Sequence, residues 1–193
     1  MADAPLDMRM DQKDSLTAGE IVNRWDQEDL RKILFEYGEE RYAPLIASAI
    51  VREREKHSIE TTGELVEVVR RAMPARALRE KQHPAKRTFQ ALRIAVNDEL
   101  SARRVALDGA AELLRPGGRL VVISFHSLED RVVKEAIRQR ENGCTCPPGF
   151  PVCVCGFRQT LKSVNKKPLT PGDEELRDNP RARSARVRIA ERI

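Results

Sequence analysis

The stretch PGGRLVVISFHSLEDRVVK, Pro116–Lys134, decides the fold that the sequence predicts. Its continuous apolar run, Leu120–Ile123, is typical of a strand covered on both faces, as in a parallel α/β sheet. Two glycines before the run supply a turn out of a preceding helix. Helical spacing returns after it, and Ser127 with Asp130 three positions later resembles a capping box. Helix, turn, strand and helix in this order predict half of a doubly wound α/β unit.

Polar residues follow this strand directly. In open α/β sheets, ligands gather at the carboxyl ends of the strands, and this is where the pattern places His126 and Ser127. The alternative is structural: a junction between a strand and a helix needs capping residues in any case, so the serines cap and His126 only packs. Both interpretations stay open on the residues alone.

The composition limits the class of protein. A chain of 193 residues is long enough for one domain, or for one domain with an inserted subdomain. No apolar run approaches the roughly 20 residues that span a bilayer, and the charged start MADAPLDMRMDQKD does not resemble a signal peptide. We therefore expect a soluble, cytoplasmic protein with no membrane partner.

The net charge of +5 is concentrated at the C-terminal end of the sequence. The segment Gly156–Ile193 holds ten Lys and Arg against five Asp and Glu, so it carries the whole excess. A second basic stretch runs from Arg76 to Arg93, where Lys86 and Arg87 fall near the start of an expected helix, whose backbone N–H groups favour anions. Such patches suit a phosphate backbone, although similar charge is also common on solvated surfaces.

All the cysteines lie in one segment, GCTCPPGFPVCVCG, at residues 143–156. The spacing is C-x-C, six residues and C-x-C, and four soft thiolates suggest tetrahedral zinc. The usual structural site has C-x-x-C pairs, so reduced surface thiols are the alternative. A catalytic metal is disfavoured, because four sulfur ligands leave no open position. The candidate metal ligands are Cys144, Cys146, Cys153 and Cys155.

The rest of the chain predicts helices first and strands last. Residues 1–14 have no periodicity and form an extended lead-in, whereas residues 15–72 have a helical pattern with capping boxes at Thr17 and Thr61. Near the C-terminus, QTLKSV and ARVRIAER alternate between apolar and polar residues, which predicts an antiparallel strand pair. We expect Val187 and Ile189 to face the core, and Arg186 and Arg188 to form an outward row.

Several longer motifs occur in the order seen in one known family. The chain resembles the bacterial small-subunit ribosomal RNA methyltransferase H family, also called MraW. The resemblance covers essentially all 193 residues, and the motifs that carry it are PLDMRMD, GEERYA, HPAKRTFQALRIAVNDEL, PGGRLVVISFHSLEDRVVK, KKPLTPGDEE and NPRARSARVRIAER. Members use S-adenosylmethionine to methylate N4 of a cytidine in 16S rRNA of the small ribosomal subunit.

The resemblance also implies a domain plan. Members have a class I, Rossmann-like methyltransferase domain interrupted by a helical subdomain. Residues 1–14 are then a lead-in from the methyltransferase core, residues 15–82 a helical substrate-side subdomain, and residues 83–193 the C-terminal half of the methyltransferase domain, with the cysteine-rich loop at 143–156.

One departure from the family pattern stands out. The first strands of the sheet, with the glycine-rich loop and the acidic residue that hold the cofactor, precede PLDMRM in the family, and no G-x-G-x-x-G occurs in this sequence. We therefore expect the C-terminal part of a methyltransferase with no cofactor-binding residues, which is inactive alone. We expect it to self-associate through an exposed sheet edge or to be less stable than a full-length relative. The alternative is a non-catalytic RNA-binding or zinc-bearing module.

The resemblance assigns roles to three groups of residues, although it leaves the catalytic residue unknown. We expect the first group to border the substrate pocket, the second to line its floor and the third to contact RNA phosphates or bases. In the structural alternative, Asp7 and Arg131 only pair with each other. The groups are Asp7, Met8 and Arg9; His126, Ser127 and Arg131; and Arg87, Asn179, Arg181 and Arg183.

Overall fold

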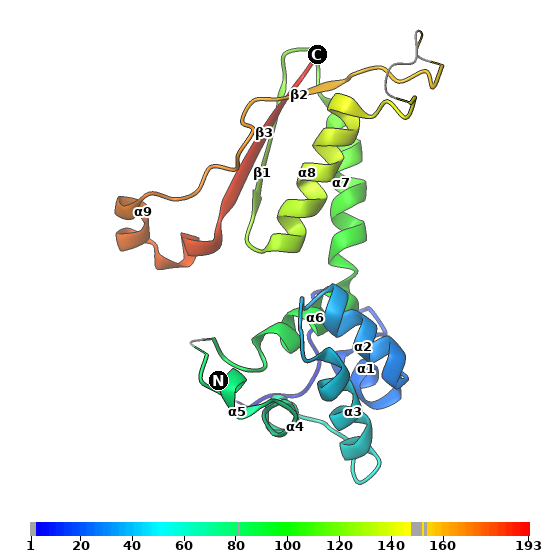
Figure 1. Cartoon of the computed structure of the whole chain (residues 1–193), viewed down its shortest axis with the longest axis vertical. Coiled ribbons are helices and arrows are strands. Elements are labelled where there is room, and N and C mark those ends of the chain that lie inside the picture. The colour runs from blue at the N-terminus through cyan, green and yellow to red at the C-terminus, as the bar shows by residue number, and fades with distance from the viewer. Residues whose placement is uncertain (1–2, 81, 148–151, 153) are drawn as a thin grey trace. The chain divides into compact units, whose positions relative to one another are not determined.

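The structure is a computed structural model that describes residues 3–80, 82–147, 152 and 154–193. The chain divides into two compact units, Met1–Glu99 and Leu100–Ile193 (Figure 1). This division differs from the boundary expected at residue 82, because the helix that starts at Lys86 packs against the first two helices of the chain. The division into lead-in, helical subdomain and C-terminal half therefore stays a prediction. Among the described residues, no helix is both long enough and apolar enough to cross a membrane.

The Met1–Glu99 unit is helical, as the periodicity predicts. The predicted capping boxes are confirmed, because Thr17 with Glu20 and Thr61 with Glu64 exchange side-chain and backbone hydrogen bonds at two helix starts. Asp26 caps the second helix by accepting from the Asp29 N–H. The helices are α1 (Ala18–Arg24), α2 (Gln27–Glu36), α3 (Ala43–Arg54), α4 (Thr62–Ala72), α5 (Ala75–Leu78) and α6 (Lys86–Asn97).

The extended lead-in is part of this unit and contributes to its core. Leu6 is buried with the helical core residues, and its N–H donates to the Glu60 carbonyl at 2.9 Å. Pro5 forms an isolated antiparallel bridge with Thr61. The prediction of an extended segment is correct, and backbone hydrogen bonds hold it in place.

The Leu100–Ile193 unit combines helices with a small sheet (Figure 1). The predicted order of helix, glycine turn, strand and helix is confirmed, with Gly117 in the left-handed region at φ 82°. The elements are α7 (Glu99–Leu113, whose first residue belongs to the other unit), β1 (Arg119–Ser124), α8 (Ser127–Asn142), β2 (Leu161–Ser163), α9 (Asp173–Asp178), the 3₁₀ helix η1 (Pro180–Ser184) and β3 (Arg186–Arg192).

The sheet has the strand order β1–β3–β2, and both pairings are antiparallel. The antiparallel pair predicted for the two C-terminal segments is therefore confirmed as β2 and β3. The parallel neighbours expected for β1 are absent from the described residues, where β1 pairs with β3 alone, from Arg119 opposite Glu191 to Ser124 opposite Arg186. The fold shown is mixed α/β, and the class I sheet topology stays a prediction.

Helices cover one face of this sheet. The core joins α7, α8, β2 and β3 through residues such as Leu107, Val133, Leu161 and Ala190. On the opposite face of β1, Val121 and Ile123 are 56% and 57% exposed. The prediction that this strand is covered on both faces is wrong for the described residues, because the apolar run alternates between a buried and an open face.

Strand β3 also lies in the opposite phase from the one predicted. Arg188 and Ala190 are 9% and 0% exposed, whereas Val187 and Ile189 are only partly buried on the other face. The prediction that the apolar residues of this strand face the core is wrong, because Arg188 pairs with Asp130 of α8 and lies on the helix-covered face.

Candidate functional site

The first predicted group, at Asp7, lies in a tightly bonded turn. The Asp7 carboxylate accepts from Nε and Nη2 of Arg9, both at 2.8 Å, and Arg9 Nη1 donates to the Asp14 carbonyl at 2.7 Å. The hydrogen bond from Arg9 lowers the pKa of Asp7 to about 2. The structure thus gives Asp7 a partner two residues away, Arg9, and the pairing with Arg131 stays a prediction.

Between these two residues, Met8 has an unusual backbone conformation. Its φ of 65° is left-handed, which costs a residue with a Cβ roughly 1–2 kcal/mol. Asn97 of α6 holds the strained segment from both sides, because its Nδ2 donates to the Met8 carbonyl at 2.9 Å and its Oδ1 accepts from the Met10 N–H at 2.7 Å. Strain that neighbouring groups maintain is a feature of functional sites. Sequence reasoning missed Asn97, and its only signal was its place in the motif ending AVNDEL.

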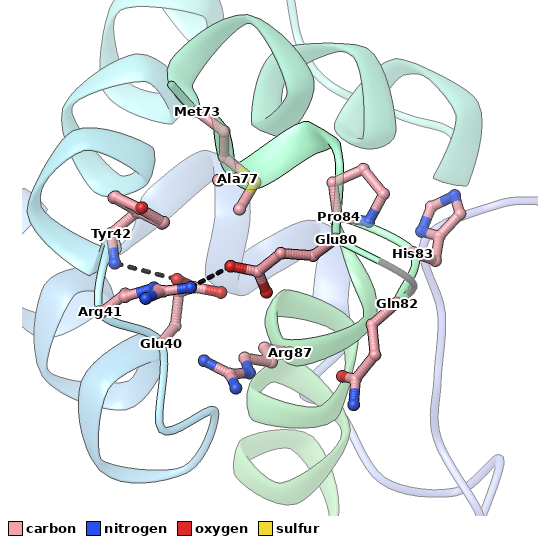
Figure 2. A pocket seen from close by; sticks show the side chains of 10 residues that line it. All are labelled: Glu40, Arg41, Tyr42, Met73, Ala77, Glu80, Gln82, His83, Pro84 and Arg87. Carbon is pink, nitrogen blue, oxygen red and sulfur yellow. Dashed lines mark hydrogen bonds and ion pairs between the residues drawn. The ribbon is translucent and has the colours of Figure 1, made fainter. Parts of the chain in front are cut away.

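Arg87 lines a pocket of the same unit (Figure 2). It reaches from the first turn of α6 towards the side of the pocket that Glu40 and Arg41 line, and its Nη1 donates to the Glu39 carbonyl at 3.1 Å. Arg41 forms an ion pair with Glu80 across the pocket. The acids offset part of the cationic charge here, so the pocket is mixed in charge. The lining residues are Glu40, Arg41, Tyr42, Met73, Ala77, Glu80, Gln82, His83, Pro84 and Arg87.

The second predicted group lies at the start of α8, where the cap differs from the prediction. His126, rather than Ser127, is the N-cap: its Nδ1 accepts from the Glu129 N–H at 3.3 Å, and Glu129 Oε2 accepts from the His126 N–H at 3.2 Å. Ser127 is the first helical residue, and Arg131 is exposed one turn further along α8. The prediction that Ser127 caps this helix and His126 only packs is therefore wrong, because His126 makes the capping hydrogen bonds although histidine is not among the usual capping residues.

Glu129 is the centre of a buried polar cluster at this junction. Its Oε2 also accepts from the Phe125 N–H at 2.7 Å, and Arg103 Nη2 lies 2.6 Å from Oε1. Burial raises the pKa of Glu129, but hydrogen bonds from His126 and Phe125 and the charge of Arg103 outweigh it and lower that pKa to about 2. The cluster holds the Glu129 carboxylate ionised at the junction, while Arg103 Nη1 and His126 Nε2 are buried with no hydrogen-bond partner among the described residues.

The arginines of β3 have structural partners. Asp130 accepts from Arg188 Nε at 2.6 Å and Nη2 at 2.9 Å, and both residues are buried. Arg186 Nη1 reaches the same carboxylate at 3.4 Å. The hydrogen bond from Arg188 lowers the pKa of Asp130. The outward arginine row predicted for this strand is therefore wrong, because Asp130 occupies both guanidinium groups.

The remaining predicted group, Asn179, Arg181 and Arg183, is exposed on and beside η1. Successive residues of a 3₁₀ helix are about 120° apart, so Arg181 and Arg183 do not project to one side as an extended chain predicts. Within the described part of the chain, neither guanidinium forms an ion pair, and the pairing with the nearby acids Asp173, Glu174, Glu175 and Asp178 is not seen.

Contacts with β3 hold the segment that carries these arginines. Leu169 and Val187 exchange two backbone hydrogen bonds of 2.9 Å, and Ala182 of η1 is buried. Asn165 extends the pairing by accepting from the Ile189 N–H at 2.7 Å and donating to the Val187 carbonyl at 3.0 Å. Sequence reasoning missed Asn165, because a single side chain that bonds to the backbone of a strand leaves no periodic pattern in the sequence.

Three of the predicted metal ligands come together. The Sγ atoms of Cys144, Cys146 and Cys155 all lie within 4.8 Å of one another, and Cys153 lies outside the described residues.

The strand-to-helix junction from β1 to α8 does not fit the glycine-rich turn that binds nucleoside cofactors in Rossmann-like domains, because it has no glycine that lets a ligand approach the backbone. The side chains of Glu129 and His126 already occupy its backbone N–H groups.

Comparison with known proteins identifies the family. Residues 1–193 match the model of the MraW methylase family. The chain is 54% identical over 192 residues to "Ribosomal RNA small subunit methyltransferase H" of Brevibacillus brevis, covering 100% of this chain and 61% of that protein. It is 57% identical over 191 residues to the proteins of the same name from Carboxydothermus hydrogenoformans and Heliobacterium modesticaldum, in each case covering 99% of this chain and 61% of the relative. The chain thus spans about three fifths of the length of these relatives, and it belongs to the MraW methylase family.

Proposed function

We propose that this chain is part of an enzyme that methylates small-subunit 16S rRNA at N4 of a cytidine, with S-adenosylmethionine as the methyl donor. The observation that carries the proposal is the family match over residues 1–193, together with relatives named for methylation of this RNA. The N4 position comes from the resemblance of the motifs to the family.

The chemistry explains why such an enzyme needs an extensive substrate-side surface. The lone pair of a cytosine amino group is delocalised into the ring, so N4 is a poor nucleophile and must be held in line with the methyl group that it attacks. S-adenosylmethionine supplies that methyl group, and the glycine-rich cofactor loop of the family does not occur in this sequence. The contribution of this chain is therefore to bind the RNA and orient a base that has left its stack.

Two features of the described residues support this role. The exposed guanidinium groups of Arg181 and Arg183 stand on a segment anchored to β3, and planar guanidinium groups match phosphate oxygens. The strained turn at Met8 is held by Asn97, which suits a segment that borders a substrate pocket. By the same proposal, His126, Ser127 and Arg131 lie at the floor of that pocket, residues 15–82 form a substrate-side subdomain, and Arg87 contacts RNA.

We also propose that the chain alone is inactive, because the glycine-rich cofactor loop of the family does not occur in its sequence. The decisive experiment measures methyl transfer from labelled S-adenosylmethionine to small ribosomal subunits that lack the modification. A chain extended upstream to the length of the relatives should label one cytidine, and the 193-residue chain should label none. Labelling of another base, or of no RNA, by the extended chain contradicts the proposed reaction.

A calorimetric titration of the 193-residue chain with S-adenosylmethionine separates the two parts of the proposal. No heat of binding is expected, with RNA binding retained and weakened by salt. Micromolar binding of the cofactor overturns the claim that this chain lacks the cofactor site.

A further inference from the structure

The loop between α8 and β2 brings three thiols together, and the reaction proposed above does not use them. Cys144 and Cys146 follow the end of α8, and Cys155 lies nine residues further along the chain. Their Sγ atoms lie within 4.8 Å of one another, and those of Cys144 and Cys155 are 3.6 Å apart. Sulfur ligands placed tetrahedrally at about 2.3 Å from Zn²⁺ lie roughly 3.8 Å from one another. The spacing of these thiols therefore suits a shared zinc ion.

Contacts at both ends of the loop impose this convergence. A Cβ atom added to Gly143 would lie only 2.0 Å from the Gln139 carbonyl oxygen and 2.8 Å from the Phe157 ring. The chain therefore needs glycine where it leaves α8. At the other end, the Thr160 N–H donates to the Arg140 carbonyl at 3.0 Å, which ties the exit of the loop to the last turn of α8.

Two apolar side chains close to the thiols in the sequence are exposed. Val152 and Val154 are 68% and 74% exposed, so their burial does not account for the conformation beside Cys155. The Val154 N–H donates a hydrogen bond to Cys146 Sγ at 3.4 Å. A donor of this kind stabilises a thiolate and orients it, as hydrogen bonds around metal ligands do.

We propose that Cys144, Cys146 and Cys155 bind one Zn²⁺ in a structural site that joins the two ends of this loop. Thiolate ligands select soft or borderline metals, and Zn²⁺ accepts tetrahedral sulfur coordination without redox chemistry. Binding releases protons from the thiols, and its free energy contributes to folding of the chain around the three ligands. The site takes no part in methyl transfer and stands independently of the proposed reaction.

The test is metal analysis and metal titration of the reduced 193-residue chain, purified without chelator. We expect one Zn²⁺ per chain, and a Co²⁺-substituted protein with the intense visible absorption of tetrahedral thiolate coordination. Cys144→Ser, Cys146→Ser and Cys155→Ser should each weaken Zn²⁺ binding by more than about 100-fold, since even loss of an outer hydrogen-bond partner costs 10–100-fold.

Thr145→Ala is the matched control, because Thr145 is exposed between two of the ligands, and it should retain the ion. Far-ultraviolet circular dichroism of each variant shows whether the rest of the chain folds. A chain that takes up no Zn²⁺ from solution overturns the proposal, as do folded serine variants that bind zinc as tightly as the unaltered chain.

Discussion

The helical unit and the sheet-containing unit bury their apolar residues in different ways. In the Met1–Glu99 unit, residues such as Ile46 and Leu65 are completely buried, and even the lead-in contributes Leu6 to the core. In the Leu100–Ile193 unit, the helices cover one face of the sheet, while Val121 and Ile123 on the other face stay more than half exposed. The first unit gains its stability from a closed core, whereas the second also depends on a buried ion pair, Asp130 with Arg188.

That ion pair gives the largest expected effect. Asp130→Ala leaves the guanidinium of Arg188 buried without its partner, and removal of one member of a buried pair typically costs about 3–5 kcal/mol. Urea unfolding followed by circular dichroism measures the loss. Asp108→Ala is the control, because Asp108 pairs with Arg140 while 47% exposed and should cost less than about 1 kcal/mol. Equal effects of the two substitutions contradict the importance given to the buried pair.

Core truncation compares the two units directly. Ile46→Ala should lower the free energy of unfolding by about 2–5 kcal/mol, because the side chain is completely buried. Ile123→Ala removes the same atoms from the open sheet face, where the side chain is 57% exposed, and should cost less than about 1 kcal/mol. Thermal melts of both variants give the comparison. A large loss at Ile123 shows that this face is covered in solution.

Acid should weaken the sheet-containing unit through Glu129. The pKa of this residue is lowered from 4.5 to about 2 in the folded chain, so its stabilisation is fully present above pH 4.5 and is lost as the pH falls towards 2. Glu129→Gln should flatten the pH dependence of unfolding in this window, by up to about 3 kcal/mol. Glu112→Gln, at an exposed position on α7, should leave it unchanged. If both variants show the same pH dependence of unfolding as the unaltered chain, protonation of Glu129 does not cause the loss of stability in acid.

The smallest expected effect is weak self-association through the sheet. In the described residues, β1 has a partner on one side only, and its open face carries exposed valine and isoleucine. Unpaired strand edges and apolar patches favour association with a second copy. Sedimentation at increasing concentration should show a rising mean mass, and Val121→Lys should reduce it. A single monomeric species at all concentrations is evidence against this prediction.

The sequence predicted local structure better than structure formed between distant residues. Capping boxes such as Thr17 with Glu20 lie within four residues, so the prediction needed no tertiary information. The phase of β3 was wrong, because Arg188 turns inward to meet Asp130, 58 residues earlier in the chain. Asn97 and Asn165 were missed for the same reason, since each replaces backbone partners of a distant segment.

The same limit applies to the residues of the candidate site. The resemblance of motifs selected residues that the structure places on ordered turns and helix ends, but it could not distinguish roles. Arg9 is bound to Asp7, whereas Arg181 and Arg183 are exposed on η1. Only the structure shows that Arg9 has a charge partner and that Arg181 and Arg183 are exposed.

RNA binding by these two exposed arginines tests the central claim most directly. The double variant Arg181→Ala and Arg183→Ala should weaken binding of a small-subunit rRNA fragment and reduce the slope of log affinity against log salt by about 1 for each phosphate that it no longer binds. Its melting temperature should change little, because both side chains are exposed. Arg104→Ala, at an exposed position on α7, is the charge control and should leave the affinity nearly unchanged. An unchanged affinity in the double variant, or a large loss of stability, contradicts the assignment of this segment to RNA.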